Sequence, residues 1–335
     1  MRLSELGEFG LIERIRKTTP KGPGVRLGIG DDAAWLECKN RSFLITSDLL
    51  IEGIHFDLRW TSFYELGYKT LAVNVSDIAA MGGQPTYLTI SMGIPVNSST
   101  KKVEDFFRGI RALGSQTGVT LVGGDTSASR LVFVSASLIG QAPFGAITRA
   151  GAKEGDDIYV TGTLGDAALG LEILKKKQKV KKGDRAFLIS RHLFPSARLK
   201  AGLTLAKERL ARAMIDVSDG LLQDLGHLCK ASKVGAVVWS EALPLSRAYH
   251  SSMSKHGPVH ALCGGEDYEL LFCLRPRDRA RLEKVKKRLG VRITCIGKCV
   301  PSRQGIRVIT SKGKSLPVPL MGYDHFKSKF PVRTS

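Results

Sequence analysis

The stretch Gly28-Ile29-Gly30-Asp31-Asp32-Ala33-Ala34 places two adjacent carboxylates behind two glycines and ahead of an apolar segment. Glycine lets the backbone turn tightly and approach a ligand closely. Two neighbouring carboxylates repel each other unless a positive charge lies between them. Glycine and aspartate are also common in turns, so the stretch alone is equally compatible with a turn at the start of a strand. Similar acids recur later in the chain, and this recurrence favours a cation site.

The same stretch fits a loose dinucleotide-binding fingerprint, Gly28-x-Gly30-x-x-Ala33. That motif requires a strand before it and a helix after it. Here a linker rich in proline and glycine, residues 18–24, precedes the motif, and a strand pattern follows it. We therefore discount dinucleotide binding.

The chain has 335 residues, which is long enough for two domains. Hydrophobic residues make up 43% and charged residues 24%, the proportions of a globular protein in water. No apolar run approaches the roughly 18 residues that a membrane helix needs, and the N-terminus lacks an apolar signal core. We expect a cytoplasmic protein with no membrane partner.

Six cysteines are spread along the chain, and none forms a C-x-x-C pair. They are Cys38, Cys229, Cys263, Cys273, Cys295 and Cys299. Without a second pair of ligands near any of them, we do not expect zinc, and reduced core thiols are the better interpretation.

The net charge is +20, from 51 basic and 31 acidic residues. Such a charge can attract nucleic acid or polyanionic substrates. The densest basic run, residues 175–182, has six lysines but no interleaved aromatic residues, which is typical of a solvated helix end or loop. We do not expect nucleic acid as a partner. Nucleic-acid affinity that falls steeply with salt, without ATP turnover, would favour that alternative.

The first part of the chain mixes helices and strands. We expect a helix over 6–16, a hairpin with its turn at 39–41 and second strand at 43–48, a helix from 61 or 62 to 81, strands over 86–94, 119–122 and 131–139, and a helix over 100–116. Asp48 is then the last residue of a strand and Asp125 follows another strand, and ligands usually bind at strand ends in α/β sheets.

The helix that ends at residue 81 carries an acid in line with its apolar face. Its strictest stripe is Phe63, Leu66, Thr70, Val73 and Asp77, at spacings of three and four residues. Burial of an unpaired charge is costly. Asp77 therefore needs a cation, or a place where the helix end opens to a cleft. A helix-end aspartate that faces solvent is the alternative.

The composition changes near residues 147–153, where we place the domain boundary, with domains at 1–148 and 149–335. In the second part we expect strands over 158–161, 213–216, 234–239, 270–274, 291–296 and 306–309, and helices over 165–175, 196–209, 221–231 and 277–289.

Many of the acids of this basic chain are concentrated in a few motifs, several of them beside glycine. They are Asp31-Asp32, Asp48, Asp77, Gly123-Gly124-Asp125, Asp216-x-x-Asp219 and Gly264-Gly265-Glu266-Asp267. Carboxylates facing one cleft suit several Mg²⁺ ions, which in turn bind phosphates, and successive glycine N–H groups can hold phosphate oxygens. The Walker pattern is absent, because Gly313-Lys314-Ser315 would need glycine at Val308, and the protein-kinase motifs are also absent.

Seven motifs, in order along nearly the whole chain, resemble the thiamine-monophosphate kinase family of the aminoimidazole-ribonucleotide-synthetase-like superfamily. They are residues 28–34, 46–48 with 52–56, 72–82, 123–126, 216–220, 264–270 and 322–326. The resemblance implies an N-terminal α/β domain that binds ATP and Mg²⁺ and dimerises through its sheet. It also implies a C-terminal α+β domain that closes the active-site cleft.

The resemblance further implies ATP-dependent phosphorylation of thiamine monophosphate to thiamine diphosphate by a homodimer. The implied ligands of several Mg²⁺ ions are Asp31, Thr46, Ser47, Asp48, Asp77, Asp125, Asp216 and Asp219. The implied ATP contacts are Gly124, Asp125, Arg149 and Ser218, and the implied thiamine-phosphate contacts are His55, Glu266 and Tyr323. No residue is expected as acid or base, because the acceptor is already an anionic phosphate; Arg149 would offset charge while the groups align for in-line transfer.

Simpler roles remain open for single residues. His55 can be a core histidine, Arg149 can pair with a surface acid, Tyr323 can pack the tail, and Glu266 can cap a turn. We expect Asp31 to be the better ligand of its pair, with Asp32 holding the turn. Two positions depart from the family pattern: Ser47 replaces a frequent threonine, and Tyr323 replaces a common tryptophan, which would weaken stacking on the substrate.

Other enzymes of the superfamily are the alternative: aminoimidazole ribonucleotide synthetase, selenophosphate synthetase, or a hydrogenase-maturation carbamoyl dehydratase. The selenophosphate enzyme would need a reactive cysteine near the N-terminus, and the first cysteine here is Cys38. The dehydratase would need a C-terminal cysteine, and this sequence ends with residues 331–335, Pro-Val-Arg-Thr-Ser.

Overall fold

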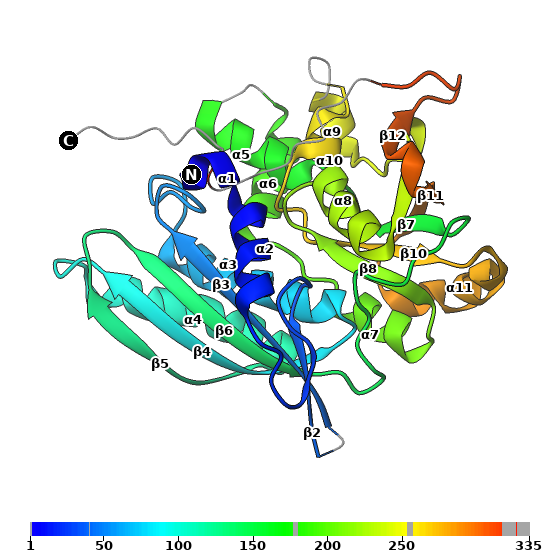
Figure 1. Ribbon diagram of the computed structural model, residues 1–335. Helices are drawn as coiled ribbons and strands as arrows, with labels where there is room; N and C mark the ends of the chain where they lie inside the picture. Colours follow the sequence, from blue (N-terminus) through cyan, green and yellow to red (C-terminus); the bar gives the residue numbers. More distant parts are fainter. Residues whose placement is uncertain (1, 40, 177–179, 253–256, 317–325, 327–335) are drawn as a thin grey trace.

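The computed structural model describes the chain except for residues 1, 40, 177–179, 253–256, 317–325 and 327–335. Tyr323 therefore lies outside the described residues. Two six-stranded sheets form the fold, one in each part of the chain, and helices pack against both (Figure 1). No helix in the described part is long and apolar enough to span a membrane.

The first sheet has the strand order β1-β2-β3-β6-β4-β5. Its strands are β1 (Val25–Leu27), β2 (Ala34–Cys38), β3 (Arg41–Ile51), β4 (Gln84–Ile94), β5 (Thr120–Ala128) and β6 (Phe133–Gln141). All neighbours are antiparallel except β4 and β5. Helices α3 (Phe63–Ala80) and α4 (Thr100–Thr117) pack together, and α3 lies against β3, β6 and β4. The other face of this sheet is left exposed (Figure 1).

Helix α3 is the central element of the molecule. Its first turn is fixed by a capping box, in which the Ser62 hydroxyl accepts from the Glu65 N–H and the Glu65 carboxylate accepts from the Ser62 N–H. Most of its residues are buried on all sides, as in a helix that packs against two domains. It meets α7 (Leu199–Lys207) so closely that a Cβ at Gly202 would lie 2.1 Å from the Ala79 carbonyl oxygen.

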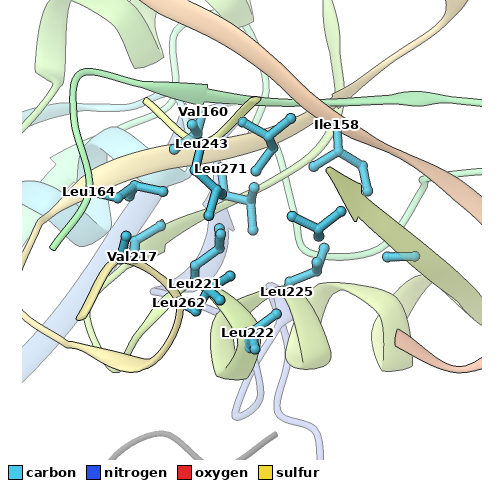
Figure 2. Close-up of a cluster of buried hydrophobic side chains, with 14 of the residues drawn as sticks. Ile158, Val160, Leu164, Val217, Leu221, Leu222, Leu225, Leu243, Leu262 and Leu271 are labelled. Atoms are coloured by element: carbon cyan, nitrogen blue, oxygen red, sulfur yellow. The ribbon is translucent and has the colours of Figure 1, made fainter. Parts of the chain in front are cut away.

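The second sheet has the order β12-β9-β11-β7-β10-β8. Its strands are β7 (Asp157–Thr161), β8 (Ala211–Val217), β9 (Val234–Trp239), β10 (Glu269–Leu274), β11 (Ile293–Pro301) and β12 (Ile306–Ile309). Leucine, isoleucine and valine side chains fill the space between this sheet and helix α8 (Leu221–Ser232), as Figure 2 shows. The two mixed sheets with their helices confirm the predicted fold class, whereas the domain boundary at 148 and 149 stays a prediction.

Shorter helices complete the described chain. They are α1 (Leu3–Leu6), α2 (Glu8–Thr18), α5 (Asp166–Lys176), α6 (Lys182–Leu193), α9 (Arg247–Ser252), α10 (Val259–Cys263) and α11 (Arg279–Val285). Single 3₁₀ turns occur at Ser240–Ala242, Pro276–Asp278, Lys286–Leu289 and Ser302–Gln304. The sequence prediction missed α6, because its residues follow the lysine run that favoured a loop.

Two strands are longer than expected, and this changes where their acids lie. Strand β3 continues to Ile51, so Asp48 lies inside the strand and not at its end. Strand β5 runs from Thr120 to Ala128, so Gly124 and Asp125 are also strand residues. The turn-forming residues in both segments pair with neighbouring strands, and that pairing overrides their local preference.

Candidate active site

Carboxylates from both parts of the chain meet at one place beside α3. Asp32 precedes β2, Asp77 lies in the last turn of α3, and Asp216 lies near the end of β8. One carboxylate oxygen from each of these three lies within 4.8 Å of the others. The charge of Asp48, on β3, also acts on Asp77. We call Asp32, Asp48, Asp77 and Asp216 the acid cluster.

Burial raises the pKa of every member of the acid cluster, and the charges of neighbouring carboxylates raise the pKa of Asp77 and Asp216 further. Burial, followed by the charge of Asp32, raises the pKa of Asp216 to about 8. Burial raises the pKa of Asp48 to about 6. Burial and the charges of Asp48 and Asp216 raise the pKa of Asp77 well above its usual range. If all four carboxylates are ionised, the protein groups around them do not supply enough positive charge to balance them.

The oxygens of the acid cluster are only partly satisfied by protein groups. The Thr46 hydroxyl donates to Asp77 Oδ2 at 2.5 Å, and the Ser76 hydroxyl donates to Asp216 Oδ2 at 2.6 Å. Within the described part of the chain, Asp32 Oδ2 and Asp48 Oδ2 are buried without a hydrogen-bond partner. Buried carboxylate oxygens without donors are the ligands that a hard cation such as Mg²⁺ takes, so these residues fit a magnesium site.

Arg149 supplies one positive charge at the edge of the acid cluster. Its Nη2 donates to Asp32 Oδ1 at 2.7 Å, and its backbone N–H donates to Asp31 Oδ2 at 3.0 Å. Burial and the charge of Asp32 still raise the pKa of Asp31 to about 7. One guanidinium does not balance five nearby carboxylates. Its Nε is buried without a hydrogen-bond partner among the described groups and lies 3.9 Å from Asp31 Oδ1.

A second group of potential ligands lies at the start of α8. Asp219, Asp224 and His227 each offer one ligand atom, and the three atoms lie within 4.8 Å of one another. Asp224 Oδ2 accepts from the backbone N–H groups of Ser218, Asp219 and Gly220. It therefore shapes the turn that presents Ser218 and Asp219, both predicted site residues. Burial lowers the pKa of His227 to about 4, so this imidazole is neutral at neutral pH.

Side-chain alternation along β3 separates the predicted ligands Thr46 and Ser47. Thr46 and Asp48 face α3, whereas Ser47 lies on the exposed face of the sheet. There the Ser47 hydroxyl donates to the Ala136 carbonyl oxygen at 3.1 Å and lies 3.0 Å from Ser137 Oγ. The structure therefore brings Thr46 to the acid cluster and points the Ser47 hydroxyl away from it.

Gly124 and Asp125 lie apart from the acid cluster within one chain. They belong to the edge strand β5, which β4 and β6 separate from β3. A Cβ at Gly124 would lie 1.7 Å from the Ile90 carbonyl oxygen, so the close approach of β5 to β4 requires glycine there. Asp125 is exposed and accepts from the Thr126 N–H at 2.8 Å. Their predicted contacts with ATP and metal stay predictions.

The predicted substrate contacts have specific protein partners. His55 is half-buried, and its Nδ1 accepts from the Ile51 N–H at 3.0 Å. Glu266 Oε1 accepts from Lys69 Nζ at 2.5 Å, and Glu266 Oε2 lies 2.7 Å from His192 Nδ1. Both carboxylate oxygens of Glu266 are therefore already in contact with protein groups.

The sequence prediction gave one of these residues a different role and did not name two others. Asp32, which we expected to hold the turn, is the member of its pair that faces Asp77 and Asp216. Ser76, which precedes Asp77, was not singled out, because a serine in a helix does not by itself indicate a site. Lys69 did carry a signal, because it lies three residues after Leu66 on the apolar side of a helix, where a lysine needs a distant acid.

Two family models match the chain, one over the part that contains the first sheet and one over the part that contains the second sheet. The AIR synthase related protein N-terminal domain matches residues 30–142, and the corresponding C-terminal domain matches residues 153–309. Fold and site thus define a two-domain protein of the AIR synthase related class.

Curated relatives and solved structures narrow this class. Thiamine-monophosphate kinase from Escherichia coli (strain K12) is 41% identical over 325 residues, which cover 96% of this chain and 98% of that protein. The enzyme of the same name from Bacillus subtilis (strain 168) is 33% identical over 331 residues, covering 96% of this chain and 100% of that protein. A structure described as AaThiL complexed with AMPPCP and TMP has a TM-score of 0.84 and 37% identity, and the match covers 97% and 99% of the two chains. The chain belongs to the thiamine-monophosphate kinase family.

Proposed function

We propose that this kinase transfers the γ-phosphoryl group of ATP to the phosphate of thiamine monophosphate, which yields thiamine diphosphate and ADP. The observation that carries the proposal is the acid cluster, which is buried, mutually repulsive and short of positive charge. The similarity to a structure complexed with AMPPCP and TMP supports the same pair of substrates.

We propose that Mg²⁺ is bound by Asp32, Asp48, Asp77 and Asp216, with Asp31, Asp219 and Thr46 at the edges of the site. Bound there, Mg²⁺ would neutralise the phosphate charges of both substrates and orient them. The Arg149 guanidinium would add a fixed donor toward a phosphate oxygen. Helix α3 and strand β8 carry Asp77 and Asp216 on rigid elements, so these ligands are fixed before the substrates arrive.

The transfer needs no general base from the protein. The terminal oxygen of the acceptor phosphate is already anionic at neutral pH and forms a bond to the γ-phosphorus of ATP. The bond between that phosphorus and the β–γ bridging oxygen breaks, and ADP leaves with the electron pair. The described site offers oxygen ligands and cationic groups, and we propose direct transfer without a phosphorylated enzyme.

A product assay tests the proposed function. The protein is incubated with ATP, Mg²⁺ and thiamine monophosphate, and thiamine diphosphate and ADP are measured. We expect both products in equal amounts and no covalently phosphorylated protein after acid or alkaline quench. Turnover of another phosphate acceptor but not of thiamine monophosphate would overturn the substrate assignment, and a trapped phosphoprotein would overturn direct transfer.

We also propose that the chain forms a homodimer through the exposed face of the first sheet. Leu49 on β3 is 48% exposed and Tyr87 on β4 is 52% exposed, and Phe133 and Ile139 on β6 share this exposed face. A sheet face with several large exposed apolar side chains and an open strand edge is normally covered in solution. Leu49→Lys is expected to convert the dimer to monomer in sedimentation equilibrium. Val96→Lys, in an exposed loop beyond β4, is the matched control and should leave the dimer intact.

A further inference from the structure

A buried lysine in α3 contacts an acid far away in the sequence. The Lys69 side chain is only 2% exposed, and its Nζ donates to Glu266 Oε1 at 2.5 Å. Glu266 belongs to the loop between α10 and β10, 197 residues later. A buried ammonium is costly without a partner, so Lys69 depends on this carboxylate.

His192 of α6 completes the contact from the other side. Its Nδ1 lies 2.7 Å from Glu266 Oε2, and the histidine side chain is 3% exposed. Burial raises the pKa of Glu266, but the charges of Lys69 and His192 outweigh it and hold that pKa well below its usual range. Burial lowers the pKa of His192. The Lys69 ammonium and the His192 imidazole thus contact the Glu266 carboxylate from two sides.

The loop that carries Glu266 is held in an unusual backbone conformation. Glu266 has φ of 70° and Tyr268 has φ of 50°, both in the left-handed region that non-glycine residues rarely adopt. Their N–H groups donate to the Ser218 and Val217 carbonyl oxygens at 2.7 and 2.8 Å. Such a conformation persists only where surrounding contacts impose it, and the contacts of Glu266 are with Lys69 and His192.

This loop connects to the acid cluster at two points. Its backbone bonds end on Val217 and Ser218, which directly follow Asp216. The Tyr268 ring packs into the hydrophobic core of the first part of the chain. Burial and the charges of Glu266, Asp48 and Asp216 raise the pKa of the Tyr268 phenol.

We propose that Lys69, Glu266 and His192 are positioning residues that fix the 264–268 loop against α3, and thereby set Asp216 at its distance from Asp77. Lys69 and Asp77 lie on the same helix, and Glu266 is hydrogen-bonded to the strand end that carries Asp216. In this role Glu266 acts through its contacts with Lys69, His192 and the Ser218 carbonyl oxygen. The effect on turnover rests on the proposed function, whereas the effect on the loop does not.

The test compares Lys69→Met, Glu266→Gln and the double variant with the wild type. Lys69→Met and Glu266→Gln are each expected to lower kcat by roughly 100-fold, as small displacements of reacting groups do, with less than about threefold change in KM for either substrate. Because both changes break one contact, the double variant should fall within about threefold of the weaker single variant. Lys69→Arg keeps the positive charge. Its decrease in log kcat relative to the wild type should be less than half of the decrease in Lys69→Met. Lys101→Met, an exposed lysine of α4, is the control and should match the wild type.

Amide hydrogen exchange supplies a readout that does not depend on turnover. In Lys69→Met the N–H groups of Glu266 and Tyr268 should exchange at least about tenfold faster than in the wild type. The exchange rates of the buried N–H groups of β9 should stay unchanged. If Lys69→Met does not fold, His192→Asn is measured in its place, with the same two amides expected to accelerate. Unchanged exchange in the folded variant would overturn the proposal.

The outcomes separate this proposal from the proposed function. A wild type that does not phosphorylate thiamine monophosphate contradicts the proposed function, and the exchange measurement then decides the positioning role alone. Glu266→Gln with a KM for thiamine monophosphate raised more than about tenfold, beside an unaffected Lys69→Met, would contradict positioning and make Glu266 a substrate contact.

Discussion

Two buried carboxylates at the same edge of the second sheet, Asp216 and Glu269, have opposite surroundings. They lie on the paired strands β8 and β10, where Asp216 is opposite Leu270 and Glu269 is opposite Val217, so their side chains lie on opposite faces. Glu269 accepts from Thr161 Oγ1, Arg191 Nη2 and Arg198 Nε at 2.5 to 2.8 Å. Asp216 has one hydroxyl donor and several acids as neighbours.

The difference predicts a structural role for Glu269 and a functional role for Asp216. Glu269 is balanced by arginines of the chain itself and needs nothing else. Asp216 and the rest of the acid cluster are balanced only if cations arrive from outside. We therefore expect fold stability to depend on Glu269 and ligand binding to depend on the acid cluster, although Asp216 and Glu269 are both fully buried.

Replacement of Asp216 by asparagine should have the largest effect on activity. Asp216→Asn keeps the shape but removes one anionic ligand, and kcat should fall on the order of 1,000-fold, as when other preorganised charges are removed from active sites. ADP release in a coupled assay measures this loss. The melting temperature of the metal-free variant should equal or exceed that of the wild type, because repulsion within the cluster decreases. A variant that unfolds while the few folded molecules remain fully active would mean that Asp216 is structural.

The same change at Glu269 should act on stability. Glu269→Gln leaves Arg191 and Arg198 without their carboxylate, and the free energy of unfolding should fall by about 3 kcal/mol. Urea denaturation followed by tryptophan fluorescence measures the change. Folded Glu269→Gln should keep kcat within about threefold of the wild type, since Glu269 touches no reacting group. If Glu269→Gln kept its stability but lost its activity, Glu269 would have a functional role and not a structural one.

The acid cluster should also make metal-free stability depend on pH. The folded-state pKa values of Asp216, Asp31 and Asp48, about 8, 7 and 6, lie above the ordinary value of 3.8. The folded chain then binds protons that the unfolded chain has released, so this contribution to stability is full below about pH 4 and is lost as the pH rises to about 8. The melting temperature without metal should therefore fall between about pH 5 and pH 8. Added Mg²⁺ should raise it more at the higher pH, and an equal increase at both values would contradict this account.

Breaking an exposed ion pair should have the smallest effect on stability and activity. Glu13 of α2 pairs with Arg16 at 2.7 Å on the surface, where water screens the interaction. Glu13→Gln should leave both the melting temperature and kcat unchanged within error. A clear loss of either quantity would show that α2 contributes more to the site than its exposure suggests.

The sequence predicted much of the fold, because α3, β9, α8 and β12 follow clear apolar patterns with caps and turns at their ends. The sequence predicted less about the direction in which each side chain points. Alternation along β3 sends Thr46 and Ser47 to opposite faces, and this becomes certain only when the strand is known to pair through Ile51. The contact between Lys69 and Glu266 joins positions far apart in the chain, which no local pattern specifies. Asp216 and Glu269 look alike as acids beside apolar strand residues, and only the placement of Arg191 and Arg198 distinguishes them.

The most direct test of the central claim is the Mg²⁺ dependence of thiamine diphosphate formation by the wild type and by Asp77→Asn. If the acid cluster holds the metal, the rate in the wild type rises from baseline to saturation with Mg²⁺. Asp77→Asn then requires at least about tenfold more Mg²⁺ for half-saturation. Equal half-saturating Mg²⁺ concentrations in the two proteins would contradict the claim that these carboxylates form the cation site.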